Sequence, residues 1–343
     1  CGFISQLHSR ALRGIVEAGL VDAAVVAACD ADLARAEACA SAHGASLATT
    51  DPAQVLSAVD AVWICTPTSS HRALVEAAAA AGVAIFCEKP LATTLADAEA
   101  MASAASTVPS QVGLVLRSSP AYGALADLVH DGSLGAPMAV VFRDDQYLPN
   151  QGQYASAWRA DVTIAGGGTL IEHSIHDLDV LRWLLGDATS VVARTANHAG
   201  HLGIEDVAVA TITFESGAVA SLTSVWHQIL TRPSNRSLEV IGVRGIAAIS
   251  GAQTDEYRGP LRVVADTGNR EEVFDLDPWV LELPIPDPWL RFAGPYASQA
   301  RGFLTSVADG SRPEPGFDVA VAAHRLADAV YRSAARGGAP VQP

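Results

Sequence analysis

Lysine is almost missing from this sequence: of the 22 lysines and arginines in 343 residues, 21 are arginine and one is Lys89. A chain that meets its other needs for positive charge with arginine has no general use for an ammonium group. Lysine differs in being a compact charge with three donors, whose pKa burial can lower. Two interpretations stay open: Lys89 is an ordinary surface residue, or it stands where chemistry requires a lysine.

Long apolar runs and a basic surface are missing as well. No run reaches the roughly 18 residues of a membrane span, so no membrane partner is expected. Acidic residues number 37 and the net charge is -15, which disfavours nucleic acid and anionic lipid as partners. The sequence also opens without methionine and without a charged and then apolar leader.

Cysteine is scarce and confined to the first 90 residues. The count is odd and the spacing lacks the paired pattern of zinc sites, which predicts free, buried thiols, a reducing compartment such as the cytoplasm, and no metal. The five residues are Cys1, Cys29, Cys39, Cys65 and Cys87.

The first third of the chain alternates short apolar runs with segments of helical period, which predicts a parallel sheet wound on both faces in a domain spanning residues 1–116. The predicted strands are 23–29, 61–66, 83–87 and 112–116. The predicted helices are 4–19, 31–43, 70–81 and 95–107.

Residues 117–343 have a different texture and predict a second domain of α/β type, built on a mainly antiparallel sheet. Turn residues join 207–214 to 218–227 and 238–243 to 246–250, which indicates two hairpins. Helices are predicted at 122–130, 297–309 and 319–336. The proline- and tryptophan-rich stretch 276–295 fits neither regular element and is predicted to be a loop.

The chain begins with what looks like the end of a dinucleotide-binding fingerprint. Gly2 precedes a predicted helix, whose N-terminal amides favour a pyrophosphate, and Ser5 takes the close-packing place. Asp30 ends the next predicted strand, where a carboxylate would accept both hydroxyls of an adenosine ribose, although it could instead cap the following helix. A carboxylate there favours NAD over NADP, while Arg35, one turn further on, leaves NADP open.

Two further predicted strands end in polar motifs. The first ends in Thr66-Pro67, and the second runs into Glu88-Lys89-Pro90. Parallel strands have their carboxyl ends at one edge of the sheet, where open α/β folds bind ligands, so Lys89 is expected beside the cofactor. A simple turn after the strand is the alternative for Thr66-Pro67.

Three adjacent glycines, Gly166–Gly168, lead into a predicted helix that carries Glu172 and His176. A spacing of four places these two side chains on one helix face. The glycines suggest that the main chain passes close to a ligand. His173 falls off that face, and a zinc site from the two histidines and Glu172 is disfavoured because the spacing converges poorly.

Taken together, these motifs resemble the Gfo/Idh/MocA oxidoreductases, a family that includes glucose-fructose oxidoreductase and myo-inositol dehydrogenase. The resemblance spans nearly the whole chain. It rests on Gly2–Ser5, Cys29-Asp30, Thr66-Pro67 with His71, Glu88–Pro90, Trp158-Arg159, Gly166–Asp179 and Val330–Ala334.

The resemblance implies a Rossmann domain followed by an α/β domain whose open sheet often forms a dimer interface, and hence a homodimer or homotetramer. It implies that Lys89 donates to the reacting oxygen of the substrate, that His176 acts as general base, and that Glu172 helps to bind substrate or relay protons. The family usually has aspartate at position 172. The longer glutamate leaves open whether the substrate and its pose are those of the inositol-type members.

The family's other site positions map onto two further groups of residues. Cofactor binding is assigned to Gly2, Phe3, Ile4, Asp30, Thr66, Pro67, His71, Glu88 and Lys89. The candidates for substrate contact are Tyr147, Trp158, Arg159 and Asp161.

The expected function is therefore hydride transfer between NAD and a secondary alcohol of a sugar, polyol or related cyclic metabolite. Two alternatives stay open: a redox-neutral glycosidase or epimerase on the same fold, and a non-catalytic sensor. The first glycine and first strand of the fingerprint are absent from the sequence. Because losing a central strand would expose two sheet edges, we expect several residues before Cys1 in the native protein.

Overall fold

The structure is a computed structural model that describes residues 1–232, 234–252, 257–266, 268–286 and 289–343. Its contacts divide the chain into two compact units. The first unit contains Cys1–Ala92, Ala96–Ser118 and Leu276–Val321, and the second contains Thr93–Leu95, Ser119–Asp275 and Ala322–Pro343.

The parallel strands of the first unit form two separate sheets, where the sequence predicted one. One sheet pairs β1 (Ala27–Cys29) with β2 (Leu47–Thr49), and the other has the order β3 (Ala61–Ile64), β4 (Ala84–Cys87), β5 (Ser110–Val112). Among the described residues, no strand pairs with both β1 and β3, so no ladder joins the two pieces. The predicted parallel direction of these strands is confirmed.

Two sequence predictions in this unit need correction. The strand β2 was not predicted, because its three residues are too short to give a period. The strand predicted at 112–116 is β5, which ends at Val112, and Val115–Ser118 forms a 3-10 helix instead. Val112, Val115 and Leu116 are all buried, and a short apolar run does not distinguish a strand from a buried helical turn.

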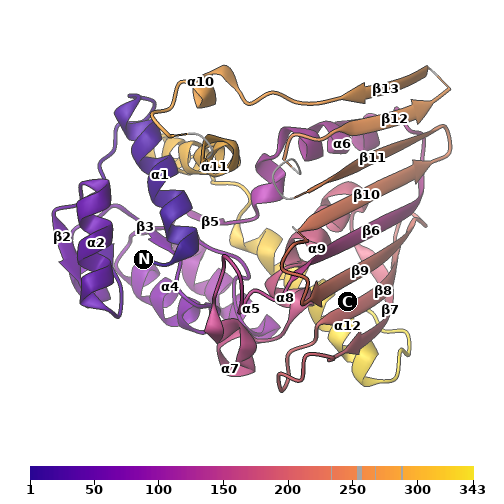
Figure 1. Cartoon of the computed structure of the whole chain (residues 1–343), viewed down its shortest axis with the longest axis horizontal. Helices are drawn as coiled ribbons and strands as arrows, with labels where there is room; N and C mark the ends of the chain where they lie inside the picture. Colours follow the sequence, from indigo (N-terminus) through magenta and orange to yellow (C-terminus); the bar gives the residue numbers. More distant parts are fainter. Residues whose placement is uncertain (233, 253–256, 267, 287–288) are drawn as a thin grey trace. The chain divides into compact units, whose positions relative to one another are not determined.

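Helices accompany the strands of the first unit as the sequence predicted (Figure 1). Helix α1 is amphipathic and buries Leu7, Ala11 and Ile15. The bounds are α1 Phe3–Glu17, α2 Leu33–His43, α3 Pro52–Leu56, α4 His71–Ala80 and α5 Leu95–Ala104, with short 3-10 helices at Thr68–Ser70 and Ala105–Thr107.

The stretch predicted to be an irregular loop is partly helical and packs in the first unit. Short α10 spans Pro278–Leu281, and the long α11 spans Trp289–Asp309 with Pro295 inside it. The ring of Phe303 on α11 packs edge-on against Phe86 and Trp63 of the parallel sheet, with centroids 5.9 and 5.2 Å apart. This burial draws 276–321 into the first unit, whereas the sequence boundary at 116/117 assigned it to the second domain.

The second unit contains an eight-stranded sheet that is antiparallel except between β6 and β9, which run parallel (Figure 1). The predicted hairpins β8–β9 and β10–β11 are confirmed. The order is β13 (Gly268–Glu272), β12 (Leu261–Ala265), β11 (Gly245–Ala252), β10 (Asn235–Gly242), β6 (Pro137–Tyr147), β9 (Val219–His227), β8 (Val207–Phe214), β7 (Ala188–Ala196).

One face of this sheet is buried and the other is open, because buried residues alternate along β8, β9 and β10. The helices of this part of the chain are α6 Pro120–His130, α7 Val162–Ala165, α8 Thr169–Glu172, α9 Ile175–Leu185 and α12 Phe317–Ala335, with a 3-10 turn at Ala157–Ala160. In the described part of the chain, no helix has both the length and the apolar character needed to cross a membrane.

All five cysteines are free, as predicted, but only Cys39 and Cys87 are buried. Cys1, Cys29 and Cys65 are partly exposed. The described residues also contain no group of three His, Cys, Asp or Glu side chains placed to hold a metal ion.

Candidate active site

The motifs that end β3 and β4 are tied together by His71, which lies at the start of α4. Its Nε2 lies 3.0 Å from the carbonyl oxygen of Thr66, and its Nδ1 lies 3.1 Å from those of Pro90 and Leu91. The side chain is 1 % exposed, and this burial lowers the pKa of His71. His71 therefore fixes the loops after β3 and β4 against each other, close to Lys89.

Glu88 anchors the same loop from the other side. Its Oε1 lies 2.7 Å from Nε2 of His8 on α1, and its Oε2 accepts the backbone N–H of Lys89 at 3.0 Å. Burial opposes ionisation of Glu88, but the hydrogen bond and charge of His8, followed by Lys89, lower its pKa. Gly113 packs against this carboxylate, since a Cβ there would lie 2.8 Å from Oε1.

The N-terminus of α1 has the properties expected of a pyrophosphate site. Gly2 is its N-cap, no side chain caps the helix, and a Cβ on Gly2 would meet nothing within 4 Å. Helix α2 is different, because Asp32 accepts the N–H of Ala34 and caps it. Asp30 is thus not needed as a cap, and that alternative for it is removed.

Asp30 is held in place at the end of β1. Its Oδ1 accepts the N–H of Asp32 at 3.0 Å. Partial burial raises the pKa of Asp30, and the hydrogen bond from the Asp32 N–H lowers it. A fixed carboxylate at this position is suited to ribose hydroxyls.

The segment carrying Glu172 and His176 is broken, which corrects the prediction of one continuous helix. Glu172 ends α8 and His176 lies in the first turn of α9, with His173 and Ser174 between the helices. The argument that a spacing of four places both side chains on one helix face therefore does not apply. Both side chains are buried, at 3 % and 6 % exposure.

Glu172 is paired with Arg159. The guanidinium Nε donates to Oε2 of Glu172 at 2.7 Å, and NH1 donates to the hydroxyl of Ser156 at 2.8 Å. The same guanidinium lies over the ring of Trp158, 4.4 Å from its centroid. Three contacts thus fix the planar group, and two of the predicted site residues, Arg159 and Glu172, are brought together.

The other predicted substrate residues have evident structural contacts. Asp161 is exposed and caps the short α7 by accepting the N–H and the hydroxyl of Thr163 at 2.9 and 2.7 Å. Tyr147 ends β6, and its hydroxyl accepts the N–H of Gln153 at 3.3 Å. Trp158 packs against the buried cluster of Leu148, Ala165, Ile204 and Trp226.

The glycine run packs against protein, not against open space as a ligand-approach role would require. A Cβ on Gly166 would lie 2.7 Å from the backbone of Thr93, and one on Gly167 would lie 2.5 Å from the hydroxyl of Tyr331. A Cβ on Gly168 would lie only 1.8 Å from the carbonyl oxygen of Glu205. Close approach of distant protein segments is the physical reason for the three glycines.

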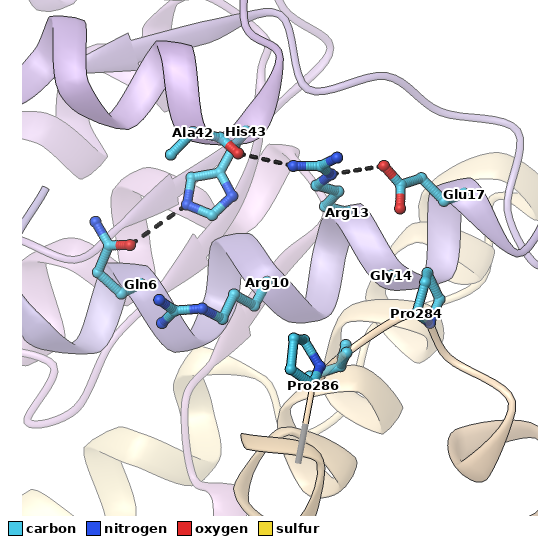
Figure 2. A pocket seen from close by; sticks show the side chains of 10 residues that line it. Gln6, Arg10, Arg13, Gly14, Glu17, Ala42, His43, Pro284 and Pro286 are labelled. Carbon is cyan, nitrogen blue, oxygen red and sulfur yellow. Dashed lines mark hydrogen bonds and ion pairs between the residues drawn. The ribbon is translucent and has the colours of Figure 1, made fainter. Parts of the chain in front are cut away.

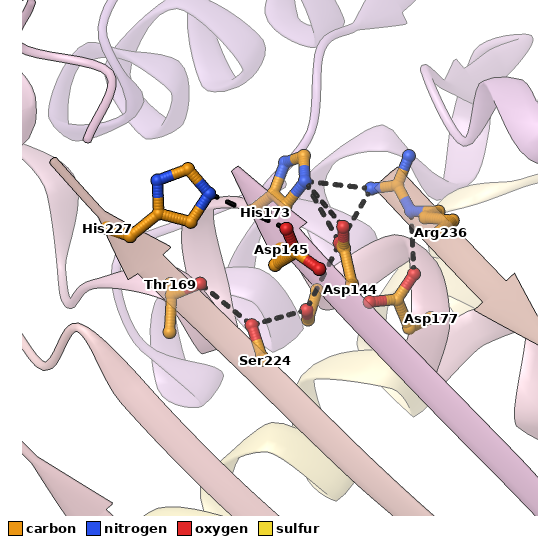
Figure 3. Close-up of polar contacts among 9 residues, drawn as sticks. Asp144, Asp145, Thr169, His173, Asp177, Ser224, His227 and Arg236 are labelled. Carbon is orange, nitrogen blue, oxygen red and sulfur yellow. Dashed lines mark hydrogen bonds and ion pairs between the residues drawn. The ribbon is translucent and has the colours of Figure 1, made fainter. Parts of the chain in front are cut away.

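A buried polar network beside α9 was missed from the sequence (Figure 3). His173 and Arg236 both reach Asp144 of β6, with nitrogen to oxygen distances of 2.9 and 3.1 Å. Arg236, on β10, also donates to Asp177 at 3.0 Å. Burial, followed by the charge of Asp144, raises the pKa of Asp177 to about 7.

Asp145, the next residue of β6, points to the opposite face of the sheet, because side chains alternate along a strand. It accepts two hydrogen bonds from Arg232, at 2.6 and 3.0 Å, and pairs with Arg143 at 2.8 Å. Two adjacent aspartates inside an apolar strand were the available signal for both networks, because buried carboxylates need cationic partners.

A groove of about 300 Å³ lies along α1, beside the C-terminal end of α2 and the segment 284–286 (Figure 2). Arg13 crosses it, bonding Glu17 through Nε and the carbonyl of Ala42 through NH1 at 2.6 and 2.8 Å. None of the predicted site residues lines this groove. The groove shares no lining residue with the motifs described above.

Comparison with known proteins agrees with the motifs. Residues 1–114 match the model of an oxidoreductase family with an NAD-binding Rossmann fold, and 126–342 match the C-terminal α/β domain of that family. A D-apiose dehydrogenase of Paraburkholderia graminis is 32 % identical, over 98 % of this chain and 86 % of its own. An inositol 2-dehydrogenase of Rhizobium meliloti is 30 % identical, over 97 % and 94 %.

Solved structures show the same fold. An oxidoreductase domain protein from Kribbella flavida has a TM-score of 0.86 at 27 % identity and covers 99 % of this chain and 96 % of its own. A levoglucosan dehydrogenase, solved with NADH and levoglucosan, has a TM-score of 0.87 at 24 % identity with the same coverage.

The chain belongs to the Gfo/Idh/MocA oxidoreductase family. It is an enzyme, a dehydrogenase that acts on CH–OH groups, and its cofactor is NAD. The N-cap Gly2, which leaves α1 without a side-chain cap, and the carboxylate of Asp30 fit this cofactor.

Proposed function

We propose that the protein oxidises a secondary alcohol of a sugar, polyol or related cyclic metabolite, with Lys89 and His176 acting on the same hydroxyl group. Bound NAD would supply the acceptor for the hydride that leaves the carbinol carbon. His176 takes the hydroxyl proton, because histidine is the side chain most often used as a general base. Lys89 stabilises the negative charge that develops on the oxygen.

The observation that carries this proposal is the fixed position of the only lysine. Lys89 lies two residues after the end of β4. Its backbone N–H is bound by Glu88, and the carbonyl of the next residue, Pro90, is bound by His71. A catalytic group must be held in place to contribute its full effect, and two buried side chains hold this loop. Nothing comparable is needed for a surface lysine.

The cofactor residues of the proposal are those at the carboxyl ends of the strands and the start of α1. In this assignment Gly2, Phe3 and Ile4 supply amides to the pyrophosphate and Asp30 accepts the ribose hydroxyls. His71 and Glu88 act by holding the loops that carry their neighbours. The remaining assigned positions are Thr66, Pro67 and Lys89.

The substrate residues of the proposal centre on the Arg159–Glu172 pair. Glu172 is charge-compensated by Arg159, so its role is to bind and orient hydroxyl groups together with the guanidinium. Trp158, Tyr147 and Asp161 support this part of the chain through the contacts described above. The relatives compared above are named as dehydrogenases, which favours net oxidation over redox-neutral hydrolysis or epimerisation.

The test is a panel of polyols, aldoses, pentoses and anhydrosugars with NAD, following the absorbance of the reduced cofactor. We expect turnover with at least one polyol or sugar in wild type. Lys89→Arg and His176→Ala should each lower kcat by about 100- to 10,000-fold, the usual contribution of a proton-transfer group. Titration with NADH fluorescence should show that both variants still bind cofactor.

The matched control is His198→Ala, which removes an exposed histidine and should leave turnover unchanged. Turnover in Lys89→Arg equal to wild type would contradict the role assigned to Lys89. Formation of product without net NADH would contradict oxidation and support the redox-neutral alternative.

A homodimer or homotetramer joined through the open sheet face is also part of the proposal. Val141, Val192 and Val209 lie on that face and are 49, 40 and 42 % exposed. Exposed apolar area of this kind favours association. Val141→Asp combined with Val209→Asp should therefore shift the protein to monomers in analytical ultracentrifugation.

The proposal also includes a location. Because the cysteines are free, we propose a reducing compartment, namely the cytoplasm.

A further inference from the structure

Glu205 is a buried acid to which the proposed function gives no role. It lies just before β8 and is 8 % exposed. Its carboxylate accepts the N–H of Gly168 at 2.8 Å and that of Leu170 at 3.0 Å, while its carbonyl accepts the N–H of Thr169 at 2.9 Å. One residue thus binds three successive amides at the start of α8.

Those amides need an external partner. The first N–H groups of a helix have no acceptor inside it, and no local side chain caps α8. An isolated helix of four residues is also unstable, because nucleation costs more than its few hydrogen bonds return. Glu205 therefore caps α8 from 35 to 37 residues away in the sequence.

Tyr331 on α12 completes the arrangement. Its hydroxyl donates to Oε1 of Glu205 at 2.9 Å. The glycine run lets these segments approach, since a side chain on Gly167 would collide with the hydroxyl of Tyr331 and one on Gly168 with the carbonyl of Glu205. Three segments, Gly166–Leu170, Glu205 and Tyr331, form one junction, which we name the Glu205 junction.

The junction lies one helical turn from Glu172. The N–H of Glu172 donates to the carbonyl of Gly168 at 3.0 Å, and its side chain holds Arg159 at 2.7 Å. A shift of α8 at its N-terminus would therefore move both members of this pair. The short loop after α8 leads directly to His176.

We propose that Glu205, held by Tyr331, is a positioning residue for the dehydrogenase reaction: it sets the place of α8 and thereby of the Glu172–Arg159 pair. The inference rests on the proposed function for its link to turnover. The hydrogen-bonding chemistry explains why a carboxylate is required. Two oxygens accept three donors, whereas an amide would place its own N–H₂ against a backbone N–H.

The variants Glu205→Gln and Tyr331→Phe test the proposal. The matched control is Asp206→Ala, because Asp206 is 3 % exposed and its Oδ2 accepts two backbone amides, of His198 and Ala199, at 2.7 and 2.6 Å in a different loop. Glu205→Gln and Asp206→Ala each lose buried bonds from a carboxylate to backbone amides, and Tyr331→Phe loses the hydroxyl bond to Glu205. Only Glu205→Gln and Tyr331→Phe change the Glu205 junction.

We expect Glu205→Gln to lower kcat/KM for the alcohol about 10- to 100-fold, the effect of misplacing a bound substrate by a fraction of an ångström to an ångström. KM for NAD should stay within about twofold. Tyr331→Phe should also lower kcat/KM for the alcohol without changing KM for NAD, and its loss of kcat/KM should be smaller than that of Glu205→Gln. Asp206→Ala should lose a similar amount of thermal stability while kcat/KM stays near wild type.

Hydrogen exchange of the backbone amides separates failure of this inference from failure of the proposed function. Faster exchange of residues 168–172 in Glu205→Gln, with β8 unchanged, would support the junction even if wild type oxidises no alcohol of the panel. Unchanged exchange at 168–172 would overturn it. Equal losses of kcat/KM in Glu205→Gln and Asp206→Ala would overturn it as well, because a purely structural role predicts that result.

Discussion

Arg236 and Asp177 form a buried ion pair, in which Nε of the guanidinium lies 3.0 Å from Oδ1 of the carboxylate and both side chains are at most 4 % exposed. Asp144 shares the same guanidinium, at 3.1 Å, so one cation faces two carboxylates. His173 is the remaining titratable group of the cluster and contacts Asp144. These bonds hold the residues on both sides of His176, namely His173 and Asp177, to the sheet.

The first prediction concerns the pH dependence of stability. Asp177 has an ordinary pKa of 3.8 when unfolded and about 7 when folded, so between these values the folded protein binds more protons than the unfolded chain. The free energy of unfolding therefore falls as the pH rises from 4 to 7. Asp177→Asn removes this titration. The Tm of the variant minus the Tm of wild type should therefore become more positive as the pH rises from 5 to 8.

Thermal unfolding monitored by circular dichroism at several pH values measures this difference. Asp161→Asn is the control, because the bonds from Thr163 lower the pKa of that exposed carboxyl and its titration lies below pH 5. A Tm difference between Asp177→Asn and wild type that stays constant from pH 5 to 8 would show that Asp177 does not titrate there.

The second prediction concerns the His8–Glu88 pair. His8→Leu leaves a buried carboxylate without its closest partner, and leaving such a group uncompensated costs about 3 kcal/mol. His43→Leu is the control in the same unit, since His43 is 9 % exposed but has only a long 3.4 Å contact to Gln6. Chemical denaturation should give a clearly larger loss for His8→Leu, and equal losses would contradict the assigned importance of Glu88.

The third prediction compares two glycines. Gly168→Ala would place a Cβ 1.8 Å from the carbonyl oxygen of Glu205, so backbone must move and stability should fall by several kcal/mol. Gly123→Ala in α6 meets nothing within 4 Å and should raise stability by about 0.5–1 kcal/mol, because alanine is the better helix former. The two free energies of unfolding should change in opposite directions.

The fourth prediction concerns cofactor choice. Asp30→Ser removes the carboxylate that accepts ribose hydroxyls and repels a 2′-phosphate, so kcat/KM for NADP relative to NAD should rise roughly tenfold or more. Asp32→Ser is the control, because serine can also cap α2 and the ratio should not change. An unchanged ratio in Asp30→Ser would show that another group selects the cofactor.

Local pattern was sufficient for the helices whose apolar residues repeat regularly, such as α1 and α12, and for the hairpins with clear turn residues. Local pattern failed to predict the secondary structure where burial in the tertiary structure outweighs local preference. Helix α11 begins at Trp289 and contains Pro295, yet packing of Phe303 on the parallel sheet stabilises a helix there.

The candidate site shows the same division. Spacing along the chain suggested that Glu172 and His176 share a helix face. The helix is interrupted at His173, whose side chain is bound by Asp144 and Arg236. The glycine run was recognised in the sequence, but the reason for it was not. Glu205 and Tyr331, the residues that approach it, are far away in the sequence. Arg236 gave no signal at all among 21 arginines.

The sequence by itself determined the family, the parallel and antiparallel halves, the likeness to a dinucleotide fingerprint, and the singular place of Lys89, because these depend on residue type and short-range period. Only the tertiary structure decided which buried polar groups satisfy one another: His8 with Glu88, Arg236 with two aspartates, Glu205 with the amides of α8. A buried donor or acceptor must find a partner to offset its lost hydration, and that partner comes from whichever segment the fold brings near it.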